Sequence, residues 1–268
     1  MTIKEFALLA GVSVSTVSKI MNGKDASISA RTREHVLKLA KEYNYVPYAS
    51  AAAPTTRTLT MGVTMTIGEY AVTGPLARYL NLHPDVNVCL RFGNTDRLLE
   101  AIRAGEMDLA LSEGYIRSEE FDTELFRRER YIPVCAAGHA LPAGKQKLKD
   151  LLGERLILRE KGSGSRKILE RNLAARNLKI SDFIHYAEVE NIHTMVSLLV
   201  RDCGIAFLYE AAVEQEIRQG LLKEIRLEDF SMDHEFLFLW NKGSVFSSEL
   251  KKLCEEWIQL DKDASGGR

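Results

Sequence analysis

Apolar side chains recur at a regular spacing along the first 22 residues. Successive members are separated by three, three, five and three positions, and they are Phe6, Leu9, Val12, Val17 and Ile20. Two helices joined by a tight turn at Gly11 would bring all five onto one side. The pattern therefore predicts a helix-turn-helix with a small apolar core beneath both helices.

The second of these helices is polar on its opposite side. The polar groups belong to Ser13, Ser15, Thr16, Ser18, Lys19 and Asn22. Short hydroxyl side chains reach DNA phosphates, and a longer cation reaches base edges in the major groove. We therefore expect the hydroxyls and Lys19 to point outward from a DNA recognition helix. A small three-helix bundle whose polar face is merely solvated is the alternative.

A third helix is predicted over residues 30–43. Ser29 precedes it as an N-cap, and Pro47 follows shortly after its end. Its buried face is expected to consist of Val36, Leu37, Leu39 and Ala40. The first 50 residues therefore have the three helices of a small DNA-binding head.

The segments TIKEFALLAGVSVSTVSKIMNG and ISARTREHVLKLAKEYNYVPYA resemble the DNA-binding headpiece of the LacI family. The resemblance implies that Val14, Ser15 and Lys19 read bases. It implies phosphate contacts for Ser13, Thr16, Ser18, Asn22, Ser29 and Thr32. In that family a hinge helix then inserts a leucine into the minor groove and kinks the DNA. Pro54 takes the place of that leucine, so we expect no kinking hinge.

From residue 59 onward, apolar strands alternate with amphipathic helices. Strands are predicted at 59–65, 86–92, 107–114, 130–137, 155–160, 184–190, 204–209, 221–227 and 235–241. Helices are predicted at 69–81, 96–104, 165–177, 192–202, 211–219 and 247–260. This order predicts an α/β fold in two lobes.

Three segments of this region resemble the LysR-type effector-binding domain. The first segment begins TMGVTMTIGEYAVTGPLARYLNLHPDV. The other two are RLILREKGSGSRKILER and EVENIHTMVSLLVRDCGIAFLYEAAVEQEIRQGLL. The resemblance covers about residues 59–260 and implies a type 2 periplasmic-binding-protein-like fold, with a small molecule held between two α/β lobes. Two crossing strands would join the lobes near 111–115 and near 207–210.

The domain order follows from these two resemblances. Residues 1–50 form a LacI-type helix-turn-helix domain, 51–58 a linker, 59–260 the effector-binding domain and 261–268 a flexible tail. LysR-type regulators normally have a winged helix-turn-helix and a long linker helix, so this chain joins the head of one family to the body of another.

Two turns of the body offer groups for an anion. The GSGS turn at 162–165 ends a strand and opens a helix, so its amides can point at a negative group. A second helix opens in the other lobe at 66–67. The resemblance implies that the effector cleft is lined by Thr66, Ile67, Ser163, Gly164, Ser165, Asn191 and Ile192. An ordinary strand-to-helix turn is the alternative for GSGS. Arg91, Arg159 and Arg166 either pair with a carboxylate effector or lie at exposed element ends.

Charge is divided unevenly along the chain. The formal net charge is −1, from 36 Lys and Arg against 37 Asp and Glu. Residues 1–60 have eight basic and four acidic side chains, a net +4 that leaves −5 on the remainder. A basic head on an acidic body is typical of a protein in which one domain alone meets nucleic acid.

The remaining composition narrows the class of protein. The four cysteines lie far apart among apolar residues, which predicts buried free thiols. Neither a Cys/His cluster nor a cofactor motif is present, so we expect no metal and no cofactor. The sequence lacks a signal-peptide pattern and an apolar run long enough to span a membrane, so we expect a cytoplasmic protein.

The sequence as a whole predicts a transcriptional regulator. It would bind double-stranded operator DNA as a dimer or higher homo-oligomer, joined through helices near 96–104 and 192–202. A small effector, expected to be anionic, would control that binding. A two-lobed solute-binding protein or an enzyme derived from that fold is the alternative. The absence of a nucleophile elbow and of an evident acid/base pair argues against catalysis.

Overall fold

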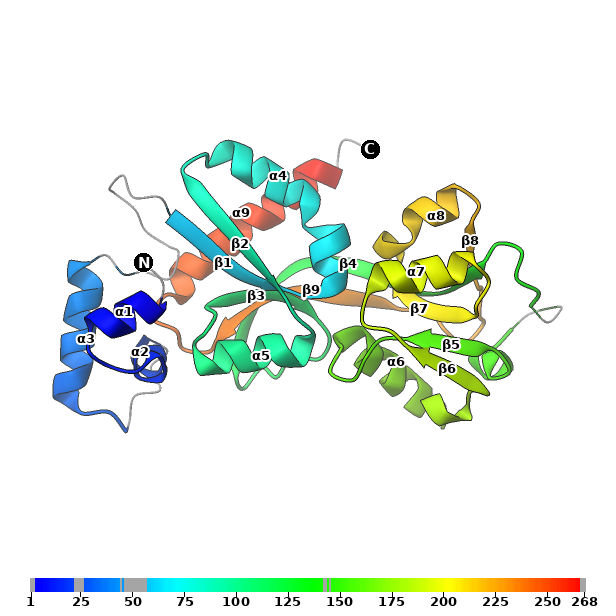
Figure 1. Cartoon of the computed structure of the whole chain (residues 1–268), viewed down its shortest axis with the longest axis horizontal. Helices are drawn as coiled ribbons and strands as arrows, with labels where there is room; N and C mark the ends of the chain where they lie inside the picture. Colours follow the sequence, from blue (N-terminus) through cyan, green and yellow to red (C-terminus); the bar gives the residue numbers. More distant parts are fainter. Residues whose placement is uncertain are drawn as a thin grey trace.

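The computed structural model describes residues 3–21, 27–43, 45, 57–141, 144 and 146–265. The described residues form a helical head and two α/β lobes arranged in a row, with the first lobe in the middle (Figure 1). None of the described helices is long and apolar enough to cross a membrane.

The head consists of α1 (Ile3–Leu9), α2 (Val14–Met21) and α3 (Ala30–Glu42). The predicted cap is confirmed, because the Ser29 hydroxyl accepts a hydrogen bond from the Thr32 amide at 3.1 Å. The Ser13 hydroxyl likewise accepts from the Thr16 amide, at 3.0 Å, where α2 begins. Tyr45 stacks on Phe6 with ring centroids 4.0 Å apart, which closes the small core.

The prediction that Leu9 is buried in the core of the head is wrong. Leu9 is 43% exposed, and the core uses Ala7 and Ala10 beside Phe6. Those three residues lie within one narrow sector of a helix of 3.6 residues per turn, whereas Leu9 lies on the other side of Phe6. The remaining predicted positions are buried or pack against the core as partly buried side chains: Val12, Val17, Ile20, Val36, Leu37, Leu39 and Ala40.

The first lobe holds one end of a mixed sheet. Its strands are β1 (Arg57–Val63), β2 (Val86–Phe92), β3 (Leu109–Glu113) and β9 (Asp233–Asn241). β1 runs parallel to β2 and β3, and β9 runs antiparallel to β3. Its helices are η1 (Ile67–Ala71), α4 (Thr73–Leu82), α5 (Thr95–Ala104) and α9 (Ser247–Ser265). The single helix predicted over 69–81 is thus a π-helical turn followed by a shorter α-helix.

The second lobe holds the other end of the sheet. Its strands are β5 (Arg155–Leu158), β6 (His185–Glu188), β7 (Ile205–Tyr209) and β8 (Leu222–Glu224). β5 runs parallel to β6 and β7. Its helices are η2 (Leu148–Leu151), α6 (Gly164–Ala174), η3 (Ile180–Asp182), α7 (Ile192–Val200), η4 (Glu210–Ala212) and α8 (Glu214–Arg218).

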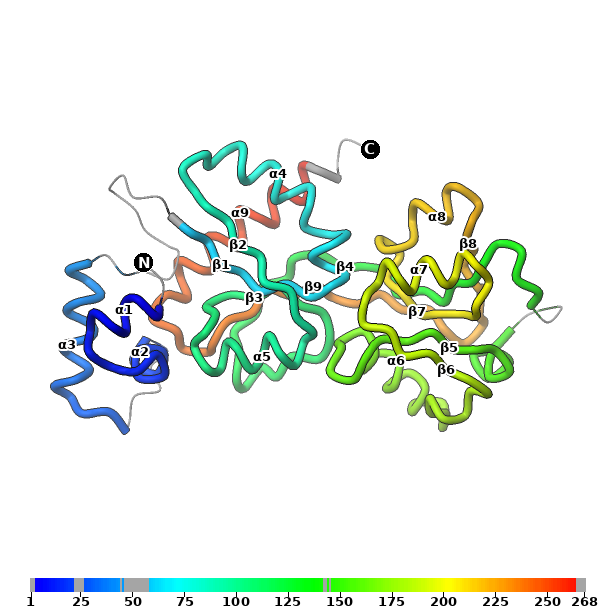
Figure 2. The backbone as a smooth tube through the Cα atoms, in the orientation of Figure 1, coloured from blue at the N-terminus to red at the C-terminus, as the bar shows by residue number. Residues whose placement is uncertain are grey.

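One long strand, β4 (Phe121–Ala136), runs through both lobes. Its residues 121–130 pair with β9 in the first lobe, and its residues 131–136 pair with β7 and β8 in the second. The strand order is therefore β2-β1-β3-β9-β4-β7-β5-β6, with β8 beside β4. Figure 2 shows β4 and the segment that enters β9 running side by side between the lobes.

The predicted positions of the crossing strands are therefore wrong. Residues 111–113 lie inside β3 and pair with β1 and β9, and residues 207–209 lie inside β7 and pair with β4. The first half of β4 went unpredicted because six of the ten residues at 121–130 are charged. Partly exposed and exposed residues alternate at 122–125 and at 127–130, as expected for a strand with one covered face, whereas residues 131–136 are all buried.

Candidate functional site

Two of the predicted effector-binding turns have buried polar side chains. Thr66, which precedes η1 in the first lobe, is 2% exposed. Ser163 and Ser165, where α6 begins in the second lobe, are 1% and 2% exposed. The two serine hydroxyls hydrogen-bond to each other at 2.9 Å. These three predicted residues are thus buried polar groups rather than exposed turn residues.

The start of α6 packs directly on the first lobe. The Asp96 amide donates to the Gly162 carbonyl oxygen at 3.3 Å, which joins the starts of α5 and α6. A Cβ atom added at Gly164 would overlap the Glu113 carbonyl oxygen and the Thr95 hydroxyl. Glycine is therefore required at position 164 by close approach of the two lobes. This contact places the predicted GSGS turn against the end of β3.

Glu113 places a carboxylate at this junction that the sequence analysis missed. Its side chain is at the end of β3, is 1% exposed and accepts a hydrogen bond from the Thr64 hydroxyl. Burial raises the pKa of Glu113, and the Thr64 hydroxyl and the positive charge of Arg159 oppose that rise. A buried acid at the meeting point of two lobes can hydrogen-bond to a ligand in either protonation state.

Arg159 supplies the positive charge of the junction. It lies just after β5, is 4% exposed and binds the Glu160 carboxylate through Nε and Nη2, at 2.8 and 3.0 Å. Its Nη1 is buried and has no hydrogen-bond partner among the described residues. A buried guanidinium nitrogen without a partner is costly, so this donor is suited to an anionic ligand. Arg166, by contrast, is occupied by Glu170, Glu188 and the Arg159 carbonyl oxygen.

Two further groups complete the junction. The Tyr209 hydroxyl, at the end of β7, is buried and without a partner among the described residues. Burial raises the pKa of Glu69 on η1, and Arg159 and His193 of the second lobe oppose that rise, so the Glu69 carboxyl lies near the second lobe. Glu113, Tyr209 and Glu69 belong to no sequence motif. Burial of a charged side chain depends on long-range packing, so no local signal in the sequence could have found them.

The other two predicted effector residues lie differently. Asn191 is exposed, and its side-chain oxygen accepts from the Thr194 amide at 2.9 Å, where it caps α7. Ile192 is fully buried in the apolar core of the second lobe, and Ile67 is fully buried in the main core. The side chains of Ile67 and Ile192 therefore serve packing, and Asn191 serves helix capping.

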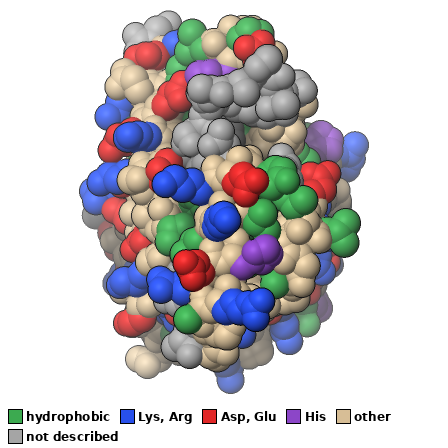
Figure 3. Space-filling view, turned by 90° about the vertical axis from the view of Figure 1, so that its left-hand side faces the viewer, with side chains coloured by type: hydrophobic (Ala, Val, Ile, Leu, Met, Phe, Trp, Pro, Cys, Tyr) green, Lys and Arg blue, Asp and Glu red, His purple; other side chains and the backbone are tan. Residues whose placement is uncertain are grey.

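The expected DNA-binding surface is exposed in part. Ser13, Ser15, Lys19 and Ser29 are exposed, and Val14, Thr16 and Thr32 are partly so. Ser18 contradicts the expectation of an outward side chain, because it is 5% exposed and lies against Gly105 of the first lobe. Asn22 and the linker residue Pro54 lie outside the described residues. The outer end of the head, seen in Figure 3, interleaves Lys and Arg with Asp and Glu rather than gathering one continuous basic patch.

All four cysteines are free, as predicted. The predicted burial is confirmed for Cys135 and Cys254, and is wrong for Cys89 and Cys203, which are partly exposed. Burial raises the pKa of the Cys135 thiol to about 11, which keeps it protonated at neutral pH. The Cys135 thiol therefore contributes packing rather than reactivity.

Together, these features define a class of protein: a two-lobed binding domain with polar groups buried at the lobe junction, preceded by a helix-turn-helix head. Residues 52–259 match the LysR substrate binding domain family, so the chain belongs to that family. Residues 2–48 match the bacterial regulatory proteins of the lacI family. The two family matches therefore place a LacI-type head before a LysR-type body in one chain.

Curated relatives include several HTH-type transcriptional regulators. The HTH-type transcriptional regulator CysL of Bacillus subtilis (strain 168) is 24% identical over 182 residues, which are 68% of this chain and 60% of CysL. The HTH-type transcriptional regulator CbbR of Sinorhizobium medicae (strain WSM419) is 28% identical over 165 residues, which are 61% of this chain and 52% of CbbR. The chain thus spans 60% or less of the length of these two relatives.

Solved structures share the fold. The CcmR regulatory domain of Synechocystis PCC6803, in complex with 2-PG, has a TM-score of 0.67 and 17% identity, and the match covers 76% of this chain and 97% of that chain. The effector binding domain of QuiR in complex with shikimate has a TM-score of 0.64 and 18% identity, with 78% and 99% coverage. At this level of identity the likeness shows the two-lobed fold alone.

Proposed function

We propose that the chain is a transcriptional regulator whose binding to double-stranded operator DNA responds to a small molecule held between the two lobes. The observation that carries the proposal is the presence, in one chain, of a helix-turn-helix head with exposed Ser15 and Lys19 and a two-lobed domain with a buried polar junction. The regulators among its relatives support it. We further propose that the protein acts in the cytoplasm and catalyses no reaction.

The proposed effector has an anionic group, such as a carboxylate. The groups available to that anion are the free Nη1 of Arg159 and the hydroxyls of Thr66, Ser163 and Ser165. Charge-assisted hydrogen bonds from a guanidinium are among the strong polar contacts in proteins. Glu113 and Tyr209 would bind a second polar group of the same molecule.

The proposed assembly is a homodimer joined through the effector-binding bodies, near α5 and α7. Two heads on linkers that lack a leucine wedge would read two half-sites. A dimer that presents two copies of one head binds a site with matching symmetry. The operator is therefore expected to contain an inverted or direct repeat.

The experiment that tests the proposed function is selection of DNA from a random duplex library by the intact protein, followed by genome-wide mapping of bound DNA. The expected result is one enriched motif with two half-sites, present upstream of genes. Failure of the intact protein to enrich any motif, at low and at physiological salt, would contradict DNA regulation.

A further inference from the structure

The head touches the first lobe through its recognition helix. In Figure 1, α2 lies between α3 and α5, so it faces the body. Ser18 on α2 meets Gly105, the residue that ends α5, and a Cβ atom added at Gly105 would overlap the Cβ and Oγ of Ser18. Gly105 has a φ of 70°, a left-handed conformation that favours glycine at a helix end. The missing side chain also leaves room for the head to approach closely.

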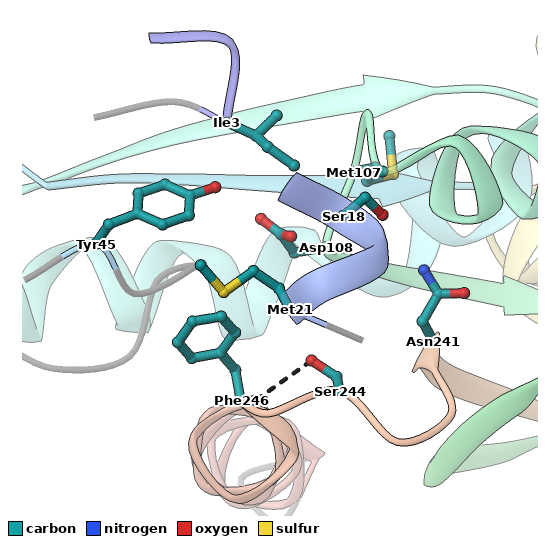
Figure 4. A pocket seen from close by; sticks show the side chains of 10 residues that line it. Ile3, Ser18, Met21, Tyr45, Met107, Asp108, Asn241, Ser244 and Phe246 are labelled. Atoms are coloured by element: carbon teal, nitrogen blue, oxygen red, sulfur yellow. Dashed lines mark hydrogen bonds between the residues drawn. The ribbon is translucent and has the colours of Figure 1, made fainter. Parts of the chain in front are cut away.

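Two further contacts join the head to the loop before α9. The Val245 amide donates to the Met21 carbonyl oxygen at 2.6 Å, which occupies a free carbonyl where α2 ends. The Phe246 ring packs both against the head core and against the main core of the body. Figure 4 shows Ser18 and Met21 on α2 facing Asp108 and Phe246 across a small pocket. The head is therefore seated on the body by polar and apolar contacts together.

The same surface of the body extends to the lobe junction. α5 begins beside Gly162 and Lys167 of the second lobe and ends at Ser18 of the head. Its ten residues span about 15 Å. β3 follows the same path, from the pocket beside the head at Asp108 to Glu113 at the lobe junction. α5 and β3 are bonded to each other at the junction, because the Thr95 hydroxyl donates to the Glu113 carbonyl oxygen at 2.9 Å.

We propose that the seated head is a low-affinity state of the DNA-binding surface, and that α5 and β3 transmit the state of the lobe junction to it. The proposal rests on the proposed function, in which α2 is the recognition helix. A recognition helix must enter a major groove about 12 Å wide. With Ser18 covered by Gly105 and the end of α2 bonded to Val245, α2 cannot present its whole polar face to DNA. Rigid elements that contact two sites can couple them when one site shifts between two arrangements.

The test compares Gly105→Asn with Gly220→Asn in the full chain. Both glycines have a φ of 70°, which asparagine tolerates, but a Cβ at Gly220 meets no atom within 4 Å. Gly105→Asn should displace the head, raise affinity for the selected operator about fivefold or more, and speed exchange of the Val245 amide. Gly220→Asn should change neither. If Gly105→Asn keeps both the operator affinity and the Val245 exchange rate of the wild type, the head is not seated on the body as described. If the Val245 amide exchanges faster but the operator affinity is unchanged, the seated head does not inhibit DNA binding.

A second pair of variants guards against misfolding at position 105. Phe246→Ala removes the ring that bridges the two cores, whereas Val245→Ala shortens a side chain that is 51% exposed. The first should raise operator affinity and the second should not. Equal affinities in this pair would contradict the proposal. If no motif is enriched by the wild type, by Gly105→Asn or by Phe246→Ala, the proposed function itself fails.

Transmission through α5 and β3 has its own test. Gly164→Ala would press a methyl group onto Glu113 and Thr95 at the lobe junction, far from the head, whereas Gly153→Ala would meet no atom within 4 Å. We expect Gly164→Ala to change the exchange rate of the Val245 amide and Gly153→Ala to leave it unchanged. An unchanged rate in a folded Gly164→Ala variant would refute the transmission.

Discussion

Asp96 of α5 and Lys167 of α6 form an ion pair that bridges the two lobes. Both side chains are more than 40% exposed, so solvent and salt screen the attraction. Lys167→Met should therefore lower the free energy of unfolding by about 1 kcal/mol or less. Urea unfolding at low and at high salt checks this. A loss of several kcal/mol that persists at high salt would show that the pair does more than hold a surface contact.

Arg159 should decide whether an anion binds at the lobe junction. A ligand at about 100 times its dissociation constant stabilises the folded state by about 2.7 kcal/mol, which a melting scan detects. A panel of small mono- and dicarboxylates should contain members that raise the melting temperature of the wild type. Arg159→Gln should abolish that rise, because the free Nη1 donor is lost. Arg155→Gln, at the exposed beginning of the same strand, is the matched control and should keep the rise.

Asp108 should make stability depend on pH. Burial raises the pKa of Asp108 from 3.8 to about 6, so the folded state holds a proton that the unfolded chain has released. The stability contributed by the protonated acid is present below about pH 4 and is lost as the pH rises towards 6. Asp108→Asn removes the buried charge, and should raise the free energy of unfolding at pH 7.5 by about 1–3 kcal/mol while changing it little at pH 4. An equal difference between variant and wild type at both pH values would contradict this account.

Lys19 should contribute to sequence recognition. Its side chain is exposed on α2, and the resemblance of the head implies a base contact. Lys19→Ala should weaken binding to the selected operator by about 1–3 kcal/mol and affect random DNA much less. The control is Lys252→Ala, an exposed lysine on α9 of the body. Equal losses on operator and on random DNA would instead make Lys19 a phosphate contact.

The sequence predicts well those features that depend on local patterns. The HTH helices, the Ser29 cap and most strands follow from spacing and capping residues within a few positions of each other. The crossing strand β4 was predicted too short because Arg128 and Arg130 lie on its exposed face, and the partly buried Arg127 adds a third charge that hides its strand character. Edge and bridging strands with one wet face give a weaker signal than buried ones.

The parts of the site that sequence patterns could not give depend on contacts between distant segments. Glu113 becomes a buried polar group only because β3 and β5 end at the same junction. Arg159 was a candidate partner for a carboxylate effector from the sequence, but its burial depends on the same packing. Ser18 has the hydroxyl expected of a phosphate contact, yet it is covered by a residue 87 positions away along the chain. No local pattern around Ser18 could have indicated that partner.

Operator affinity of the intact protein, measured with and without the carboxylate that most raises its melting temperature, tests the central claim most directly. The claim is that the head and the lobe junction share one coupled equilibrium. Coupling free energies of about 1–3 kcal/mol correspond to affinity changes of roughly 5- to 150-fold. We predict a change of that size in the wild type and its loss in Arg159→Gln. Identical operator affinity with the carboxylate bound and absent would contradict the account.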